Sequence, residues 1–165
     1  MRQSGMKYAL MRSMVLFALA LPGWAALAAP SDSESGPSAG VAEDADYAVG
    51  RKAFEAGDWQ TMTGAFNKVV AKDPGNANAH NFLGYAYRKS GKLDLAFKHY
   101  EEALRIDPRH RGAHEYIGET YLLTNNLAKA EEHLKALDGI CTFGCAEYND
   151  LKKAVAEYKR NNAKS

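Results

Sequence analysis

The sequence predicts an all-α protein, an antiparallel helix-hairpin solenoid of three repeats that ends in a C-terminal capping helix. Three observations support this prediction: a 34-residue internal repeat, a helical period of apolar residues within the repeats, and turn residues between the periodic runs. Apolar residues make up 46% of the 165 residues and charged residues 25%, which is ordinary for a globular protein. The length has room for one domain.

The 34-residue offset aligns residues of every size. It pairs Pro74 with Pro108 and aligns three glycines: Gly50, Gly84 and Gly118. The repeats that it defines cover residues 43–76, 77–110 and 111–144. We expect each hairpin to contact mainly its neighbours along the chain, as in other repeat proteins.

The middle copy shows why this spacing predicts a helical hairpin. Residues 79–87 place their apolar side chains on one helical face, and Gly91 then supplies the left-handed residue that commonly ends a helix. A second periodic run, residues 93–104, is closed by Pro108, because proline disfavours helix in the residue before it. Two helices joined by a short turn follow from this pattern.

The spaced pattern of the middle copy is Ala79-(3)-Leu83-Gly84-(2)-Tyr87-(3)-Gly91-(4)-Ala96-(3)-Tyr100-(2)-Ala103-(4)-Pro108. This pattern closely resembles the tetratricopeptide repeat family. His80 stands where the family usually has tryptophan, and Asn125 replaces the turn glycine in the third copy. End copies that depart from the pattern are expected of a solenoid. The resemblance covers residues 43–144 and implies stacked helical hairpins.

A further helix is predicted after the repeats, over about residues 145–160, within a segment of cap and tail that covers residues 145–165. Its apolar stripe consists of Tyr148, Leu151, Val155 and Tyr158. One-sided amphipathicity suits a capping helix, because the last repeat would otherwise expose its apolar flank.

The first 28 residues have the features of a secretory signal peptide. A basic start with Arg2, Lys7 and Arg12 precedes the short apolar run 14–21, and a small-residue exit ends at Ala28. The alternative is a membrane anchor, although the run is short for a bilayer and Pro22-Gly23 interrupts it. We therefore expect an exported protein, periplasmic or secreted, with residues 29–42 as a flexible leader rich in Ser, Pro and Gly.

The charge of the cleaved chain bears on its partners. Cleavage after Ala28 removes three of the 21 basic residues and none of the 20 acidic ones, which leaves a formal charge of −2. Nothing in this balance favours nucleic acid or an anionic membrane surface. We expect no membrane insertion after cleavage and a protein or peptide as partner.

Cys141 and Cys145 are the two cysteines of the chain, and an even count in an exported protein favours a disulfide. Free thiols remain the main alternative, while a zinc site lacks its second cysteine pair. His110 and His114 have a spacing that can bind metal, but a turn residue and a packed imidazole are the favoured interpretation. No catalytic motif is found, so we expect no enzyme, no cofactor and no metal.

In the tetratricopeptide family, the first helix of each hairpin lines a concave groove that receives a partner's peptide or helix. By resemblance, the lining here maps onto Tyr47, Arg51, Phe54, Asn78, Asn81, Tyr85, Arg88, Lys89, Glu115, Glu119 and Leu122. The alternative for Arg88 and Lys89 is that they only complement the helix dipole. The charges predict acidic partner groups against the second repeat and basic groups against the third.

These observations predict a binding protein rather than an enzyme. The leading interpretation is an envelope adaptor whose groove docks a partner in a larger assembly. The alternative is a chaperone-like holder of unfolded clients, as some exported relatives are during cytochrome maturation. An adaptor should have one stoichiometric partner, whereas a holder should suppress the aggregation of several unrelated clients.

Overall fold

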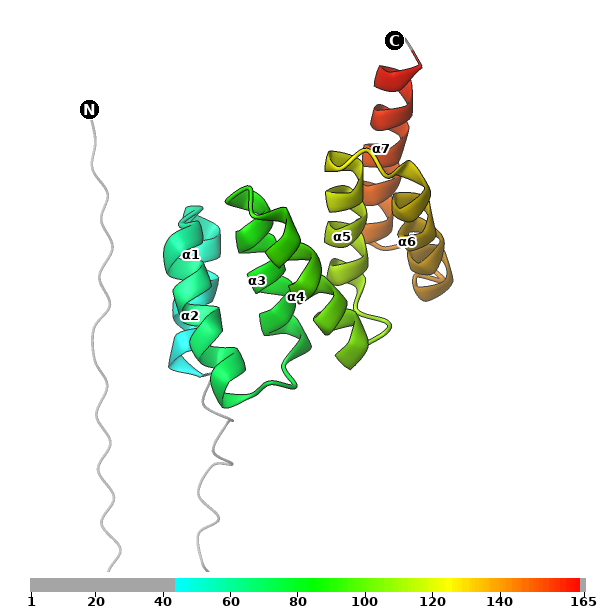
Figure 1. Ribbon diagram of the computed structural model, residues 1–165. Helices are drawn as coiled ribbons and strands as arrows, with labels where there is room; N and C mark the ends of the chain where they lie inside the picture. Colours follow the sequence, from blue (N-terminus) through cyan, green and yellow to red (C-terminus); the bar gives the residue numbers. More distant parts are fainter. Residues whose placement is uncertain (1–43, 164–165) are drawn as a thin grey trace, which may run out of the picture. The chain divides into compact units, whose positions relative to one another are not determined.

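The computed structural model describes residues 44–163, which form seven α-helices and no strand (Figure 1). The predicted signal peptide and the whole predicted leader, together with Glu43 and the last two residues, lie outside this range. The helices are α1 Ala45–Ala56, α2 Trp59–Lys72, α3 Ala77–Lys89, α4 Leu93–Ile106, α5 Arg111–Leu123, α6 Leu127–Ile140 and α7 Ala146–Asn162.

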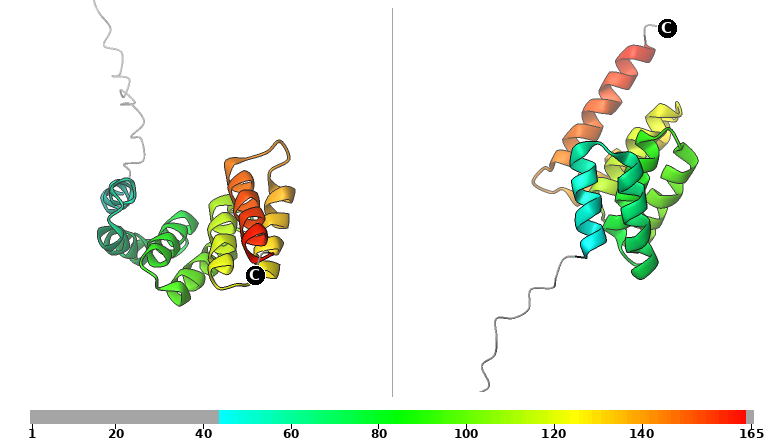
Figure 2. Two further views of the ribbon diagram at one scale, coloured as in Figure 1. Left: turned by 90° about the horizontal axis from the view of Figure 1, so that it is seen from above. Right: turned by 90° about the vertical axis from the view of Figure 1, so that its left-hand side faces the viewer.

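Consecutive helices form antiparallel hairpins: α1 with α2, α3 with α4, and α5 with α6 (Figure 1). Each hairpin packs on the next through α2 against α3 and α4 against α5, while α7 packs on both α5 and α6. Seen from above, the hairpins of this range follow one another in chain order (Figure 2). The predicted fold class, an all-α array of helical hairpins with a C-terminal helix on its flank, is confirmed.

The turn inside each hairpin depends on one residue with a left-handed backbone. Gly57, Gly91 and Asn125 hold this place, with φ angles of 70°, 73° and 58°. Asparagine tolerates the left-handed region better than most residues with a side chain, so it replaces glycine in the third hairpin. The turn positions predicted from the repeat are therefore occupied as expected.

Close helix contacts explain the repeated glycines. A Cβ placed on Gly84 would lie 2.5 Å from ring atoms of Tyr100, which is fully buried. Two further glycines face a bulky side chain in the same way: Gly50 meets Phe66 and Gly118 meets Leu151. The missing side chains let the helices approach, and the large side chains then fill the space.

Two histidine pairs, each made of one buried and one half-buried imidazole, recur one repeat apart. The Nδ1 atoms of His80 and His99 lie 3.1 Å apart, and the Nε2 atom of His80 lies 3.2 Å from the carbonyl oxygen of Pro74. Because a carbonyl only accepts, His80 donates from Nε2, and its Nδ1 then accepts a hydrogen bond from His99. The next repeat has the same arrangement among His114, His133 and the carbonyl of Pro108.

His114 is a packed imidazole, as expected from the sequence, and His80 is packed in the same way one repeat earlier. In each pair the second imidazole also stacks on a tyrosine: His99 on Tyr87 and His133 on Tyr121. Burial and the adjacent imidazole lower the pKa of both His99 and His133 to about 4. His99 and His133 are therefore neutral at physiological pH.

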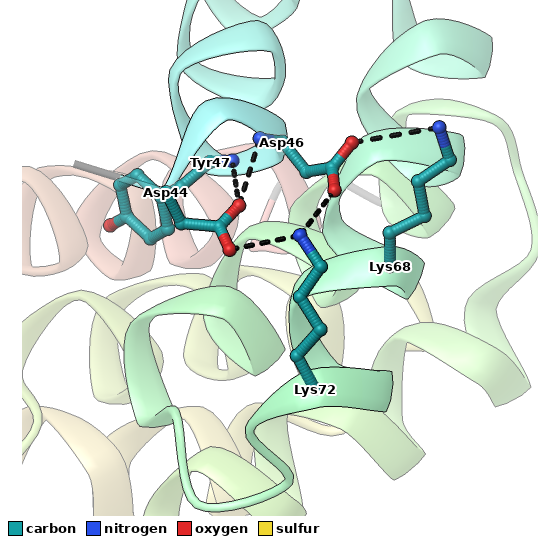
Figure 3. Close-up of polar contacts among 5 residues, drawn as sticks. All are labelled: Asp44, Asp46, Tyr47, Lys68 and Lys72. Carbon is teal, nitrogen blue, oxygen red and sulfur yellow. Dashed lines mark hydrogen bonds and ion pairs between the residues drawn. The ribbon is translucent and has the colours of Figure 1, made fainter. Parts of the chain in front are cut away.

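A polar cluster joins the first turn of α1 to the last turn of α2 (Figure 3). Asp44 caps α1 by accepting hydrogen bonds from the backbone N–H groups of Asp46 and Tyr47. The ammonium group of Lys72 lies 3.0 Å from Asp44 and 2.6 Å from Asp46, and Lys68 lies 3.5 Å from Asp46. Acids at a helix start and lysines at a helix end also complement the two helix dipoles.

The capping helix α7 is held by its apolar stripe and by a covalent link. Leu151 and Val155 are buried, and Tyr148 packs against the same cluster. Cys141 and Cys145 form a disulfide across the turn between α6 and α7, with their Cα atoms 5.7 Å apart. A loop this short contributes about 2 kcal/mol or less in the chain-entropy view, so the packing of α7 supplies most of its attachment.

Residues 44–163 lack two kinds of feature. No helix in this range is both long and apolar enough to span a bilayer. Within the same range, no group of three or more His, Cys, Asp or Glu side chains is arranged to hold a metal ion.

Candidate binding groove

The first helices of the hairpins, α1, α3 and α5, carry the residues predicted to line a groove. α3 packs against α5, and α5 packs against α7. Aromatic side chains connect α1 to α3, since Phe54 contacts Phe82 and Tyr85 with ring centroids 5.6 and 5.1 Å apart. Phe54 and Tyr85, predicted lining residues of the first and second repeats, therefore lie side by side.

Tyr85 is the centre of an aromatic cluster that extends over three repeats. Its ring lies 5.1 Å from Phe54, 5.6 Å from Trp59 and 4.9 Å from Tyr116, measured between ring centroids. Tyr47 extends the cluster on α1, 6.1 Å from Phe82. Rigid rings with a polar edge provide contact area at a low cost in conformational entropy, which suits a binding surface.

Arg88 lies largely buried against this aromatic cluster. Its guanidinium carbon lies 5.1 Å from the ring centroid of Tyr85 and 5.3 Å from that of Tyr116. Its Nη1 atom donates a 2.6 Å hydrogen bond to Glu119 of the next repeat. The side chain of Arg88 is only 13% exposed. Cation–π contact and a charge-assisted hydrogen bond thus hold Arg88 between α3 and α5.

The Arg88–Glu119 ion pair corrects the distribution of partner-facing charges that was expected from the sequence. Arg88 and Glu119 were each expected to be available for charges of the partner, but they neutralise one another. Residues 31 positions apart meet here because equivalent turns of α3 and α5 lie side by side. Replacement of Arg88 would also affect folding, because this buried side chain and its ion pair connect two repeats.

Lys89 and Arg51 are exposed cations beside the aromatic cluster. The Lys89 ammonium lies 5.6 Å from the ring of Trp59 and 5.9 Å from that of Tyr85, and the Arg51 guanidinium lies 5.9 Å from the ring of Phe82. Each cation therefore lies over an aromatic face while it remains accessible to solvent. A peptide that docks here would meet an aromatic surface edged with positive charge.

The two predicted asparagines of α3 differ in their surroundings. Asn78 contacts His110, with 3.0 Å between its Oδ1 atom and the imidazole Nε2 atom. Asn81 is only 6% exposed, and its Oδ1 atom has no hydrogen-bond partner among the described residues. Its amide lies against Gly112, where an added Cβ would come within 3.2 Å of Nδ2. A buried acceptor without a partner is costly unless a ligand or water supplies a donor.

Glu115 is a buried carboxyl group on α5. It is 8% exposed and has no hydrogen bond or ion pair within residues 44–163. Burial raises its pKa to about 8, and the nearby carboxylates of Glu119, Asp150 and Glu147 raise it further. Near neutral pH this group is therefore largely protonated, and a cation beside it would favour its ionised form.

Helix α7 completes the C-terminal end of the groove. A cavity of about 360 Å³ lies between α5 and α7, and its lining includes Arg88, Leu122, Leu123 and Tyr158. A second cavity, of about 290 Å³, is lined by Glu115 and Asp150. The two cavities adjoin, because they share three lining residues: Glu119, Ala154 and Glu157.

Sequence analysis predicted a groove lined by residues of all three repeats, but it named none of the α7 residues that line the two cavities. Asp150, Ala154, Glu157 and Tyr158 recur at helical spacing, and this period could have identified them. The aromatic residues Trp59, Phe82 and Tyr116 were also missed, since they flank the family's lining positions. Leu123 was missed too, although it is 60% exposed and lines the larger cavity.

An array of stacked helical hairpins defines a helical-repeat protein. Two family models match the chain, and both describe the tetratricopeptide repeat. One matches residues 77–110 and the other residues 98–144. Residues 77–144 are therefore tetratricopeptide repeats. No curated protein sequence compared with the chain gave a significant match.

Solved structures show the same fold. The TPR2B domain of yeast Sti1, in a complex with pHsp70, matches with a TM-score of 0.64 and 18% identity, over 70% of this chain and 94% of the domain. The translocator chaperone SycD of Yersinia enterocolitica type III secretion matches with a TM-score of 0.63 and 17% identity, over 72% and 83%.

A third structure is PcrH in complex with the chaperone binding region of PopD. It matches with a TM-score of 0.61 and 20% identity, over 72% of this chain and 90% of that chain. At identities of 17–20%, these three likenesses concern the fold alone.

Proposed function

We propose that this protein is a non-enzymatic interaction scaffold that docks a peptide or helix of a partner protein in the groove along α1, α3, α5 and α7. The observation that carries the proposal is Leu123, a leucine 60% exposed at the edge of a 360 Å³ cavity whose lining also includes Leu122 and Tyr158. An exposed aliphatic side chain beside a cavity and an aromatic cluster is typical of a binding site.

The comparisons support this proposal in one respect. The complexes with pHsp70 and with the chaperone binding region of PopD show structures of this fold with a bound partner. Tetratricopeptide proteins are in general binding scaffolds without catalytic activity. In this chain, α3 and α5 present rigid aromatic area.

We further propose that the scaffold acts as an adaptor in a bacterial-type cell envelope. The signal-like residues 1–28 support export, and the Cys141–Cys145 disulfide suits an oxidising compartment.

The native protein is expected to begin near Ala29, because signal peptidase would cut after the small-residue exit at Ala28. N-terminal sequencing of the protein from its native host measures this. Recovery of the intact N-terminus in a membrane-bound form would contradict export and release.

The docking proposal predicts contacts of a discrete partner with the groove alone. A photoactivatable phenylalanine analogue is placed at Lys89 or at Leu123, and at Asp94 on α4 as the control; all three side chains are exposed. Irradiation in the native host should give one specific crosslinked protein from the two groove positions and none from Asp94. Equal yields at all three positions, or crosslinking from Asp94 alone, would refute groove binding.

A chaperone-like holder of unfolded clients is the second candidate. SycD, which has the same fold, is described as a translocator chaperone, and this likeness favours the candidate. A holder would give many crosslinked proteins from Lys89 and Leu123 and would suppress the aggregation of unrelated unfolded clients. One stoichiometric crosslinked partner would instead support the adaptor.

A further inference from the structure

The C-terminal end of the groove combines two neighbouring environments. The 290 Å³ cavity has a carboxylate lining from Glu115 and Asp150, while the 360 Å³ cavity has an apolar lining from Leu122, Leu123 and Tyr158. The cavities share Glu119, Ala154 and Glu157, so one ligand segment can enter both. A side chain in each cavity would then come from neighbouring positions of the same segment.

The charged groups that face this end of the groove come from three helices. α3 supplies Arg88, which Glu119 of α5 neutralises. α7 supplies Glu157, which lies 3.8 Å from Arg160, and the exposed Lys153. Two carboxyl groups, those of Glu115 and Asp150, remain without an ion pair among the described residues.

Glu115 distinguishes this place from an ordinary acidic surface. Glu115 is 8% exposed, lines the smaller cavity and has no ion pair within residues 44–163. The carboxylates of Glu119, Asp150 and Glu147 raise the pKa of Glu115 beyond the effect of burial, and the opposing effect of Arg88 is smaller. A nearby cation would stabilise the ionised form of such a buried carboxyl group.

We propose that the groove between α5 and α7 binds a partner segment in which a lysine or arginine side chain is next to an aliphatic or aromatic side chain. The cation enters the smaller cavity and pairs with Glu115 and Asp150. The apolar side chain occupies the larger cavity over Leu122, Leu123 and Tyr158. This inference rests on the docking function proposed above and specifies the chemistry of the partner.

Proton release should accompany binding. Glu115, with a pKa of about 8, is largely protonated at pH 7, and a cation beside it lowers that pKa, so the carboxyl group loses its proton on binding. About one proton per complex is expected at pH 7. Binding is therefore expected to tighten as the pH rises from 6 to 8.

The test uses the full-length chain and a library of random dodecapeptides displayed on phage. Selected peptides should place Lys or Arg beside Leu, Ile, Phe, Trp or Tyr. The double variant Glu115→Gln/Asp150→Asn should bind a selected peptide about tenfold more weakly, because it removes both carboxylates while keeping their size. The control variant Glu101→Gln, on an exposed residue of α4, should bind it as the wild type does.

Calorimetric titration of the same peptide in phosphate and in Tris buffer measures the proton release. Selection of acidic or uncharged peptides, no selection at all, unchanged affinity in the double variant, or binding without proton release would each overturn the inference. So would dimerisation of the chain that blocks peptide binding, because a second copy would then occupy the groove. Specific crosslinking from Lys89 and Leu123 would still uphold the docking function in each of these cases.

Discussion

Replacing Gly84 by alanine is expected to lower the free energy of unfolding by about 2–3 kcal/mol, although alanine favours helix over glycine. The added Cβ would lie 2.5 Å from Cδ1 and Cε1 of Tyr100 and 2.9 Å from its Cγ. The Tyr100 ring is fully buried, and the new Cβ would be too close both to its Cγ atom and to its Cδ1–Cε1 edge. Rotation of the ring about its own axis therefore cannot relieve the clash. Helices α3 and α4 must therefore separate.

Gly64 provides the matched control within the same fold. It lies exposed in α2, and a Cβ added there would meet no other atom within 4 Å. Gly64→Ala should therefore raise stability by about 1 kcal/mol through helix propensity alone. Urea denaturation followed by circular dichroism measures both variants. Equal effects of the same sign would show that helix propensity, and not the contact with Tyr100, decides the cost at Gly84.

Acidification from pH 7.5 to 4.5 is expected to destabilise the protein through its two histidine pairs. Burial holds the pKa of His99 and His133 at about 4, against an ordinary value of 6.5. The unfolded chain therefore binds more protons between these two values. The stabilisation is complete above about pH 6.5 and is lost as the pH falls toward 4. After a discount for solvent screening of these partly exposed rings, the loss is about 2–4 kcal/mol.

A non-titrating variant isolates this effect. His99→Asn/His133→Asn keeps an N–H donor near each Nδ1 position and removes the titrating rings. Its stability at pH 7.5 should fall because the stacking on Tyr87 and Tyr121 is lost. The slope of unfolding free energy against pH between 6.5 and 4.5 should nevertheless become shallower. A slope equal to that of the wild type would contradict the assignment to the histidine pairs.

Glu115 acts in the opposite direction and must be accounted for in the same measurement. Burial raises its pKa to about 8, so the folded chain binds the extra proton between this value and the ordinary 4.5. Stability from this group therefore rises as the pH falls from about 8. The variant Glu115→Gln removes this contribution, and the acid-induced loss should then appear larger than in the wild type.

The fold could be predicted from the sequence because its contacts are local. Each hairpin packs mainly on the next one, so a 34-residue offset records the whole arrangement of the repeats. The same offset relates His99 to His133, and comparison of these two residues would have indicated the histidine pairs. The bonds within each pair could not be predicted, because they depend on how the first and second helices of a hairpin cross.

The groove could be predicted only in outline. Lining positions followed from the family resemblance, and the contact of Phe54 with Tyr85 shows that neighbouring repeats bring such positions together. The pairing of Arg88 with Glu119 and the burial of Glu115 depend on the reach of side chains between repeats and on the cover provided by α7. The apolar periodicity of a single repeat gives no information on side-chain contacts between repeats or on the cover provided by α7.

The contact of Gly118 with Leu151 limits how this protein can lengthen in evolution. In the first two repeats, the glycine receives a ring from its own hairpin, Phe66 or Tyr100; in the third, the nearest atoms belong to α7 instead of Leu134. A duplicated 34-residue unit inserted ahead of Arg111 would bring its own glycine and its own ring. A unit inserted between α6 and α7 would withdraw Leu151 and leave a void at Gly118 until another side chain evolved to fill it.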